Sequence, residues 1–395
     1  MYPTERNGSV LSKIEAYFGL DGSTWIPSLD GLRGIAIWMV LNTHILLIFL
    51  ADHYYAGKGS LIDSTLNALQ AGDIGVELFF VLSGFLIYRS IKSKKPGFFR
   101  FMSDRYRRLL PMLLIFAVAL AVSMILAGFA SNSMFWDKLE TLINTITLLQ
   151  IFNAPLPSIV MWTLVYEIYF YILAGFLLIV LDDKITRSWL GFFLVALMVW
   201  SSQFVLMQSP IPQTYRFMGF FFGMAVAKIV EARKKIPAEN HLWLIGAAGI
   251  SALLVYAGVI ARDSGWQGDV MIRNIYFPLA SMCFALVLIS ALNEKSVIHR
   301  ILSYKPLRIA GLISYPIFLI NLIVRDNVWS ILYDKIGGFA QVIAVYLLTI
   351  IVSCIFSALL WKNIEFRLKP RKREGRAENR MAKAKSGFLN HTGQK

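Results

Sequence analysis

The sequence is poor in charge and in cysteine, and each shortage excludes a class of protein. Charged residues make up 16% of the 395 residues, whereas hydrophobic residues make up 57% and the mean hydropathy is +0.59. A soluble domain is typically about 45–50% apolar, so a large soluble domain is excluded. The two cysteines, Cys283 and Cys354, lie in separate apolar runs, which gives neither a disulfide framework nor a metal-binding spacing. Carboxylate and histidine residues also do not cluster at ligand spacing, so no metal site is predicted.

Long apolar runs recur from one end of the chain to the other. Runs of about 18 residues are long enough to cross a hydrocarbon core of about 30 Å. We therefore expect an all-α, polytopic membrane protein, with about ten transmembrane helices around a central polar cavity. The predicted spans are 33–51, 74–91, 109–129, 162–181, 188–207, 216–230, 242–260, 274–292, 309–331 and 341–361. A shorter apolar run at 141–153 is predicted to be interfacial or re-entrant.

The net charge of +15 is distributed in a way that predicts the orientation. With ten spans, the segments on the N-terminal side of the membrane hold 32 Lys and Arg residues, and the opposite segments hold 6. Arg325, inside a predicted span, completes the 39. Basic residues are enriched in cytoplasmic loops, so both termini are predicted to be cytoplasmic. A nucleic-acid binder would also be basic, but here the charge forms juxtamembrane clusters at 89–108 and in the tail after Lys362.

The chain is predicted to have one membrane domain with two short flanking segments. Residues 1–28 are expected to form a cytoplasmic or interfacial segment, and residues 29–365 the transmembrane domain. Residues 366–395 are predicted to form a basic cytoplasmic tail, which we expect to be disordered because it is rich in Arg, Lys and Glu.

His44 lies deep inside the first predicted span. A helix rises 1.5 Å per residue, so His44 is about 16 Å beyond Arg33, near the bilayer centre. Eleven residues make close to three turns, so the two side chains share a helix face. Ionisable residues are costly in a membrane span and tend to line interiors and pathways, and a neutral imidazole can act as a general base. The alternative is a structural histidine, hydrogen-bonded to a neighbouring helix.

Further polar residues fall at related depths. Glu167 is predicted about 8 Å below the outer end of its span, and Asn321 about 18 Å from the inner end of its span, level with the histidine. Ser314 and Tyr315 are predicted to lie nearer the inner mouth. Glu77 is predicted near the outer end of its span, where it is either part of a polar path or an interfacial carboxylate.

The stretch FFRFMSDRYRRLLP is predicted to be an inner loop that presents Arg105, Arg107 and Arg108 just before the third span. Guanidinium groups hold phosphate in a bidentate manner, so one interpretation is a phosphate clamp, with Arg33 across the same mouth. The other interpretation is that these residues only set the orientation of the chain.

Several motifs occur together and in a fixed order along the chain. They are SLDGLRGIAI with Arg33 and His44 separated by ten residues, GVELFFVLSGFLI, RYRRLLP, MWTLVYEIYFY, GLISYPIFLIN and the closing NIEFRLKP. Over roughly residues 28–370 the chain thereby resembles the membrane-bound acyltransferase-3 family of bacterial O-acyltransferases, which modify polysaccharides, O-antigens and glucans. The chain departs from the family pattern at Asn321, where relatives often carry His, and at Glu77, where relatives often carry Asp.

The resemblance implies an O-acetyltransferase of the bacterial inner membrane. Such an enzyme would move an acyl group, usually acetyl, from cytoplasmic acyl-CoA to a hydroxyl of an extracytoplasmic carbohydrate or glycolipid. The acyl-CoA is a donor substrate, and no cofactor is implied. The candidate catalytic residues are His44 and Glu167, and the candidate substrate-binding residues are Asp30, Arg33, Glu77, Arg105, Arg108, Ser314, Tyr315 and Asn321.

Each candidate has an expected role in this reaction. His44 would take the proton of the acceptor hydroxyl, and Glu167 would orient His44 or the sugar. Arg105 and Arg108 would hold the phosphates of CoA, and Asn321 or Tyr315 would stabilise the oxyanion.

Several alternatives remain open at this point. An acyl-imidazole on His44 could form as a covalent intermediate instead of direct transfer. A proton-coupled transporter or exporter would also use a polar path, but the chain has no pair of matching broken helices of the kind common in transporters. A membrane sensor or scaffold would leave Arg33, His44 and Glu167 without a role.

Overall fold

The computed structural model describes most of the predicted membrane domain. The described residues are 17–18, 26–46, 65, 68–69, 71–126, 161–205, 214–233, 241–257, 270–332 and 339–365. The short apolar run at 141–153, the tail at 366–395 and most of the segment 1–28 lie outside them. Within the described residues all regular elements are helices and none is a strand, which confirms the predicted all-α class.

Each predicted span overlaps a helix. The longer helices are α2 (Pro27–Leu41), α5 (Gly75–Lys94), α6 (Phe98–Leu126), α8 (Met161–Gly175), α9 (Trp189–Val205), α10 (Phe217–Arg233), α11 (Leu242–Val255), α12 (Val270–Ala291), α15 (Ser314–Leu332) and α16 (Phe339–Leu360). The short elements are η2 (Asn42–Leu46), η3 (Ala71–Ile74), η5 (Phe176–Val180), η6 (Thr214–Arg216), α13 (Val297–Leu302), α14 (Lys305–Leu312) and η9 (Trp361–Glu365).

Five of the described helices are long and apolar enough to cross a membrane. A sixth span results if α14 and α15 are taken together, although they are bent by 70° at the break between them. Helices α9 and α11 are apolar but shorter. Length and composition thus support a membrane protein, with five or six candidate spans among the described residues.

Helix α6 differs from the sequence prediction. The arginine-rich stretch before residue 109 was predicted to be a loop, but α6 begins at Phe98 and runs without interruption to Leu126. No Gly or Pro occurs between Phe98 and Leu110, so nothing in that stretch breaks a helix. The arginines therefore lie on a rigid helix with fixed directions.

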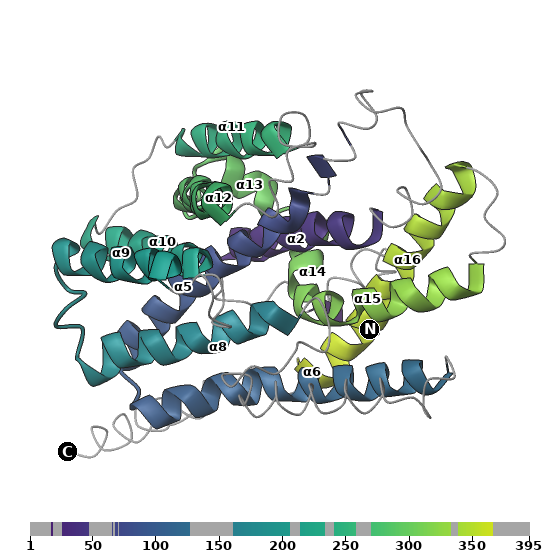
Figure 1. Ribbon diagram of the computed structural model, residues 1–395, viewed down its shortest axis with the longest axis horizontal. Helices are drawn as coiled ribbons and strands as arrows, with labels where there is room; N and C mark the ends of the chain where they lie inside the picture. Colours follow the sequence, from purple (N-terminus) through teal and green to yellow (C-terminus); the bar gives the residue numbers. More distant parts are fainter. Residues whose placement is uncertain are drawn as a thin grey trace, which may run out of the picture.

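Helices α2 and α5 lie at the centre of the bundle, and the other helices surround them (Figure 1). Helix α5 packs most extensively against α10, and α2 packs against α14. Glycines make the α2–α14 contact close. A Cβ on Gly311 would lie 1.8 Å from the Asp30 carbonyl oxygen, and a Cβ on Gly34 would lie 2.2 Å from the Leu307 carbonyl oxygen. This packing brings the start of α15 next to α2.

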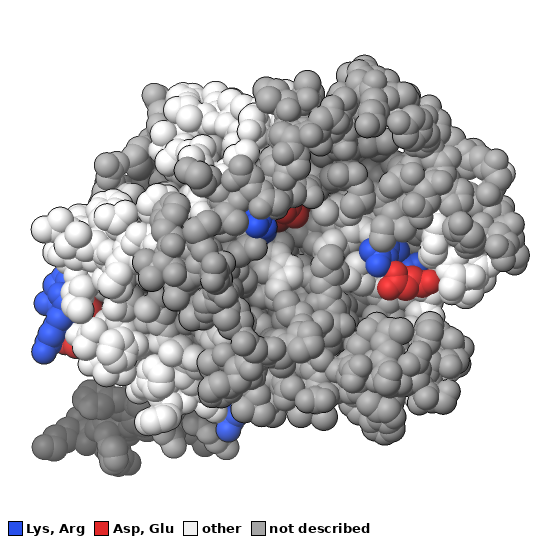
Figure 2. Space-filling view, viewed as in Figure 1, with Lys and Arg blue, Asp and Glu red and all other residues white. Residues whose placement is uncertain are grey.

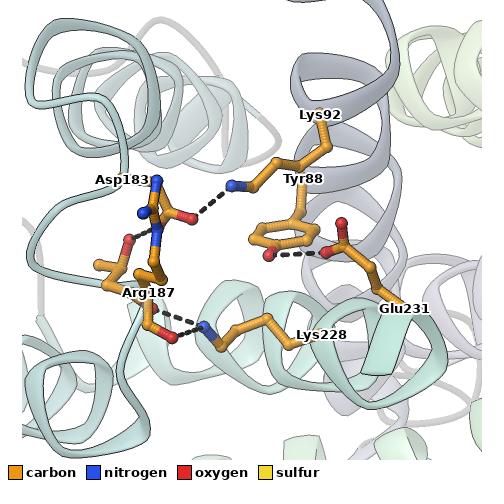
Figure 3. Close-up of polar contacts among 7 residues, drawn as sticks. Tyr88, Lys92, Asp183, Arg187, Lys228 and Glu231 are labelled. Atoms are coloured by element: carbon orange, nitrogen blue, oxygen red, sulfur yellow. Dashed lines mark hydrogen bonds and ion pairs between the residues drawn. The ribbon is translucent and has the colours of Figure 1, made fainter. Parts of the chain in front are cut away.

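Polar contacts join the helix ends at Lys92 and Glu231 (Figure 3). Lys92 of α5 pairs with Asp183 in the turn after η5, and Tyr88 of α5 donates a hydrogen bond to Glu231 of α10 at 3.1 Å. Lys228 of α10 donates to the carbonyl oxygens of that same turn. The three stretches were all predicted to lie on the cytoplasmic side, and in the structure they lie together.

The visible surface carries little charge. In Figure 2 most of the described surface on that face is uncharged, and several of the small charged groups place basic next to acidic side chains. Large apolar side chains are exposed on α9, among them Leu190 and Met198 at 71% and 64%. An apolar exterior of this kind suits contact with lipid.

Replacement of Gly311 by Ala is expected to destabilise the protein. The added methyl group would collide with the backbone of Asp30, which cannot rotate away, and overpacking of this kind typically costs about 1–3 kcal/mol. Gly97→Ala is the matched control because a Cβ there meets nothing within 4 Å. The test is the temperature at which detergent-solubilised protein loses its monodisperse size-exclusion peak. A Gly311→Ala variant as heat-resistant as Gly97→Ala would contradict the close α2–α14 contact.

Candidate active site

A cavity lies between α2, α5, α6, α8, α14 and α15, each of which contributes lining residues. The empty volume among its lining residues is about 910 Å³, a figure that includes space open to solvent. Half of the candidate residues from the sequence line it: Arg33, Arg108, Glu167, Ser314 and Tyr315.

Two guanidinium groups reach the cavity, Arg33 from α2 and Arg108 from α6. Arg33 Nη1 lies 3.9 Å from Asp30 Oδ1, one turn back along α2, and the Arg33 side chain remains 19% exposed. Asp30 is buried and, among the described residues, does not belong to the cavity lining. Asp30 therefore helps to orient the Arg33 guanidinium, and does not itself face a ligand in the cavity.

Arg105 was predicted to form a clamp with Arg108, but of the two only Arg108 is among the residues that line the cavity. Arg105 lies one turn before Arg108, about 60° away around the helix axis. Its Nη2 donates to Ser90 Oγ at 3.4 Å, and its guanidinium lies over the Phe101 ring. The pair of arginines that faces the cavity is Arg33 and Arg108.

Glu167 lines the cavity from α8. The Tyr171 hydroxyl, one turn further along α8, donates a hydrogen bond to Glu167 Oε1, and Ser83 Oγ of α5 lies 3.5 Å from the same oxygen. The guanidinium groups of Arg105 and Arg108 interact electrostatically with Tyr171. Glu167 thus lies near the arginines of α6, and its depth in the membrane stays a prediction.

His44 lies in η2, the π-helical continuation of α2. Its Nδ1 is 3.1 Å from Asn321 Oδ1 of α15, and its backbone carbonyl accepts a hydrogen bond of 2.9 Å from Arg325 Nη1. π-helical segments occur frequently at functional sites. Two residues of α15, one turn apart, therefore hold both the ring and the backbone of His44.

The cavity ends close to His44 but does not include it. Phe318 is the lining residue of α15 nearest to Asn321, which follows three residues later, a rise of about 4.5 Å. Phe79 of α5 lies edge-on to Phe318, with 6.4 Å between the ring centroids, and also lines the cavity. In the described residues, the His44–Asn321 pair thus lies about one helical turn beyond the aromatic end of the cavity.

Glu77 is not part of the cavity lining among the described residues. It is 0% exposed and accepts hydrogen bonds from Arg216 Nη1 at 2.8 Å and from Ser281 Oγ at 3.0 Å. The Arg216 guanidinium lies 3.8 Å from the Phe277 ring centroid and also contacts Trp162. Helix α5 turns Glu77 toward α10 and α12, whereas Val76 faces the cavity. Glu77 therefore joins three helices, and its predicted substrate contact is not supported.

Three further role predictions are not supported by the contacts. Tyr315 lines the cavity, but its hydroxyl donates to the Leu109 carbonyl at 3.2 Å. Asn321 Nδ2 donates to the carbonyls of Ile317 and Phe318, so neither residue presents a ready donor for an oxyanion. Glu167 does not contact His44, and it is Asn321 that does.

Sequence reasoning also missed Arg216, Arg325 and Tyr171. Arg325 carried a usable signal, because it was the one basic residue well away from the ends of its predicted span. Tyr171 follows Glu167 by four residues, which places both on one helix face. Arg216 had no such signal, since it stands at a predicted span boundary where a basic residue is common.

Comparison with known proteins gives one family and several curated relatives. The family model of the acyltransferase-3 group, described as an acyltransferase domain, matches residues 26–358. The peptidoglycan O-acetyltransferase OatA of Listeria monocytogenes is 24% identical over 322 residues, which are 75% of this chain and 48% of that protein. YrhL of Bacillus subtilis (strain 168) is 27% identical over 387 residues, 89% of this chain and 55% of that protein.

A third relative is the O-acetyltransferase OatA of Staphylococcus aureus (strain MRSA252). It is 24% identical over 400 residues, which are 92% of this chain and 60% of that protein. The chain thus spans about half the length of the curated relatives it matches. No solved structure matches the chain.

The Glu77–Arg216 pair gives a prediction about stability. Glu77→Leu leaves the Arg216 guanidinium buried without its main partner, and breaking a buried pair typically costs about 3–5 kcal/mol. The double variant Glu77→Leu/Arg216→Met removes both charges and is expected to be less destabilised than the sum of the two single variants. Thermal unfolding of all four proteins in one detergent measures this coupling. Additive losses would show that the pair carries no coupling energy.

Proposed function

The chain belongs to the acyltransferase-3 family, and on that premise we propose that it is an integral-membrane O-acyltransferase. It transfers an acyl group, acetyl in the first instance, from acyl-CoA to a hydroxyl of an extracytoplasmic carbohydrate or glycolipid. The observation that carries this proposal is the convergence of Arg33, Arg108 and Glu167 on one cavity, with His44 about one turn beyond its aromatic end.

The cavity suits a CoA thioester. The phosphates of CoA bind Arg33 and Arg108, because planar guanidinium groups match phosphate oxygens in a bidentate manner. The pantetheine arm is long enough to carry the thioester about 15 Å further, roughly three helical turns. To reach His44, the acyl end passes between Phe79 and Phe318, whose rings pack edge to face.

The reaction then needs a base at the far end. His44 Nε2 accepts the proton of the acceptor hydroxyl while the hydroxyl oxygen attacks the thioester carbonyl. The tetrahedral intermediate collapses and expels the thiolate of CoA, which the proton on His44 then neutralises. General-base help of this kind typically contributes about 10²–10⁴ in rate.

The arrangement in the membrane follows from the same proposal. Ten spans with both termini in the cytoplasm of a bacterial inner membrane would put the donor on the Arg108 side and the acceptor on the other side. Two groupings support this sidedness. The segments of Lys92, Asp183 and Lys228 lie together, and Asp73 and Arg216, from segments predicted to lie outside, also meet, at 3.9 Å.

The acceptor class rests on the relatives. The Listeria monocytogenes relative is named for peptidoglycan, which is a glycan outside the cytoplasmic membrane. That name supports a carbohydrate hydroxyl as the acceptor of this chain, without specifying the sugar.

Replacing His44 by Gln is expected to abolish transfer. Membrane vesicles that contain the protein receive acetyl-CoA with a radiolabelled acetyl group on the cytoplasmic side, and label in envelope glycan is measured. The rate should fall by about 10²-fold or more, the usual contribution of a general base. His299→Gln is the matched control, because His299 is also buried but contacts the Ala291 carbonyl and not the site.

The same assay separates the enzyme from a transporter. Wild type that incorporates no label, while a proton-gradient-driven flux persists in wild type and His44→Gln alike, would refute acyl transfer. Rates are normalised to monodisperse protein, so that loss of folding is not counted as loss of chemistry.

The donor site predicts a difference between two neighbouring arginines. Arg108→Gln removes a guanidinium from the cavity, and a lost hydrogen bond to a charged group costs about 1.5–3 kcal/mol. Its KM for acetyl-CoA is therefore expected to rise by about 10-fold or more. Arg105→Gln is the control, since Arg105 faces Ser90. Equal increases in both variants would contradict the assignment of Arg33 and Arg108 as the phosphate site.

A further inference from the structure

We propose that Asn321 is a positioning residue that fixes the tautomer of His44, holding the hydrogen on Nδ1 and leaving Nε2 as the basic nitrogen. The inference deepens the proposed function and rests on it for its catalytic meaning. It also stands on a hydrogen-bond geometry that can be tested without any acyl transfer.

The orientation of the Asn321 amide is set by its own helix. The nitrogen lies 3.0 Å from the Ile317 carbonyl oxygen and 2.7 Å from the Phe318 carbonyl oxygen. Carbonyl oxygens only accept hydrogen bonds, so the amide nitrogen has to face them and both of its hydrogens are used. Asn321 is 0% exposed, and a flipped amide would bury two oxygen–oxygen contacts at its own helix.

The orientation of the amide determines the state of the histidine ring. With its nitrogen committed, Asn321 presents Oδ1 to His44 Nδ1 at 3.1 Å. An amide oxygen has no hydrogen to give, so a hydrogen bond at this position requires the hydrogen on Nδ1. A neutral imidazole carries only one hydrogen on its nitrogens, and Nε2 therefore holds the lone pair. Within the described residues no hydrogen-bond partner occupies Nε2.

Helix α15 fixes the position of His44 as well as its tautomer. Arg325 follows Asn321 by four residues, so both side chains project from one face of α15. Arg325 Nη1 binds the His44 carbonyl at 2.9 Å, and Tyr346 of α16 donates to Asn42 Oδ1 of the same π-helical segment at 2.8 Å. The π-helical segment is thus held at the His44 carbonyl and at the Asn42 side chain, which limits how far the ring can turn away from Asn321.

The consequence is a base with one defined reactive atom. If the hydrogen were on Nε2, the lone pair would point at Asn321 and the ring could not accept a proton from an acceptor hydroxyl. The amide oxygen carries no net charge, so it selects the tautomer without holding the protonated ring as strongly as a carboxylate would. Asn321 therefore acts through His44 and touches neither substrate.

Nitrogen-15 solid-state NMR of the histidine-labelled full-length protein in lipid bilayers tests the tautomer directly. The chain has five histidines, and the signals of His44 are those that vanish in His44→Gln. At alkaline pH the wild type is expected to show the hydrogen on Nδ1. Asn321→Leu removes the acceptor and is expected to shift the hydrogen to Nε2, whereas Asn321→Asp keeps an oxygen in place and is expected to retain the Nδ1 form.

A second readout is the acetyl-transfer assay with radiolabelled acetyl-CoA. Asn321→Leu is expected to lower kcat by about 10- to 100-fold, a part of the general-base contribution, with little change in KM for acetyl-CoA. Asn327→Leu is the matched control, since Asn327 lies on the same helix and bonds Ser123 Oγ, not His44.

The outcomes separate this inference from the proposed function. A wild-type His44 with its hydrogen on Nε2, or an Nδ1 form that persists in Asn321→Leu, overturns the role of Asn321 whatever the activity. A wild type without acetyl transfer overturns the proposed function, and the NMR spectra alone then decide whether Asn321 sets the tautomer of His44.

Discussion

The cost of burying a polar group among apolar helices governs the placement of the candidate residues. A charged or hydrogen-bonding side chain in such an interior needs a partner, and here another helix usually supplies it. Asn321 and Arg325 of α15 hold His44, Arg216 pairs with Glu77, and Ser83 approaches Glu167. Each contact satisfies a buried group and also joins two elements that are distant in sequence. The site and the bundle therefore depend on the same contacts.

Close backbone packing decides which side chains can meet. Gly34 and Gly311 let α14 approach α2, and the 70° bend after α14 redirects the chain into α15. As a result α15 begins at the cavity with Ser314 and passes His44 two turns later with Asn321. Without this bend, the same helix would not both line the cavity with Ser314 and contact His44 with Asn321.

The sequence was a good guide to helix positions and a poor guide to the directions of side chains. The positions of the helices and the common level of His44 and Asn321 followed from spacing alone, because the rise of a helix is constant. Which neighbour a side chain faces depends on how each helix is rotated about its axis and packed against the others. The spacing of residues along the sequence does not specify that rotation. Glu77 and Arg105 were misplaced for this reason, and the π-helical turn at His44 had no sequence signature. The sequence showed Arg325 as a charge inside a predicted span, but only the structure identified its partner, the His44 carbonyl.

The central claim is that a CoA thioester bound at Arg33 and Arg108 reaches His44. A cryo-electron microscopy structure of the protein in lipid nanodiscs with a thioether analogue of acetyl-CoA tests it most directly. The account predicts phosphate density against both guanidinium groups, with the Phe79 and Phe318 rings parted and the acyl carbonyl carbon within about 4–6 Å of His44 Nε2, which leaves room for a hydroxyl at hydrogen-bond reach. An acyl end that stops on the cavity side of the closed rings, or a His44 Nε2 that faces lipid, would contradict it.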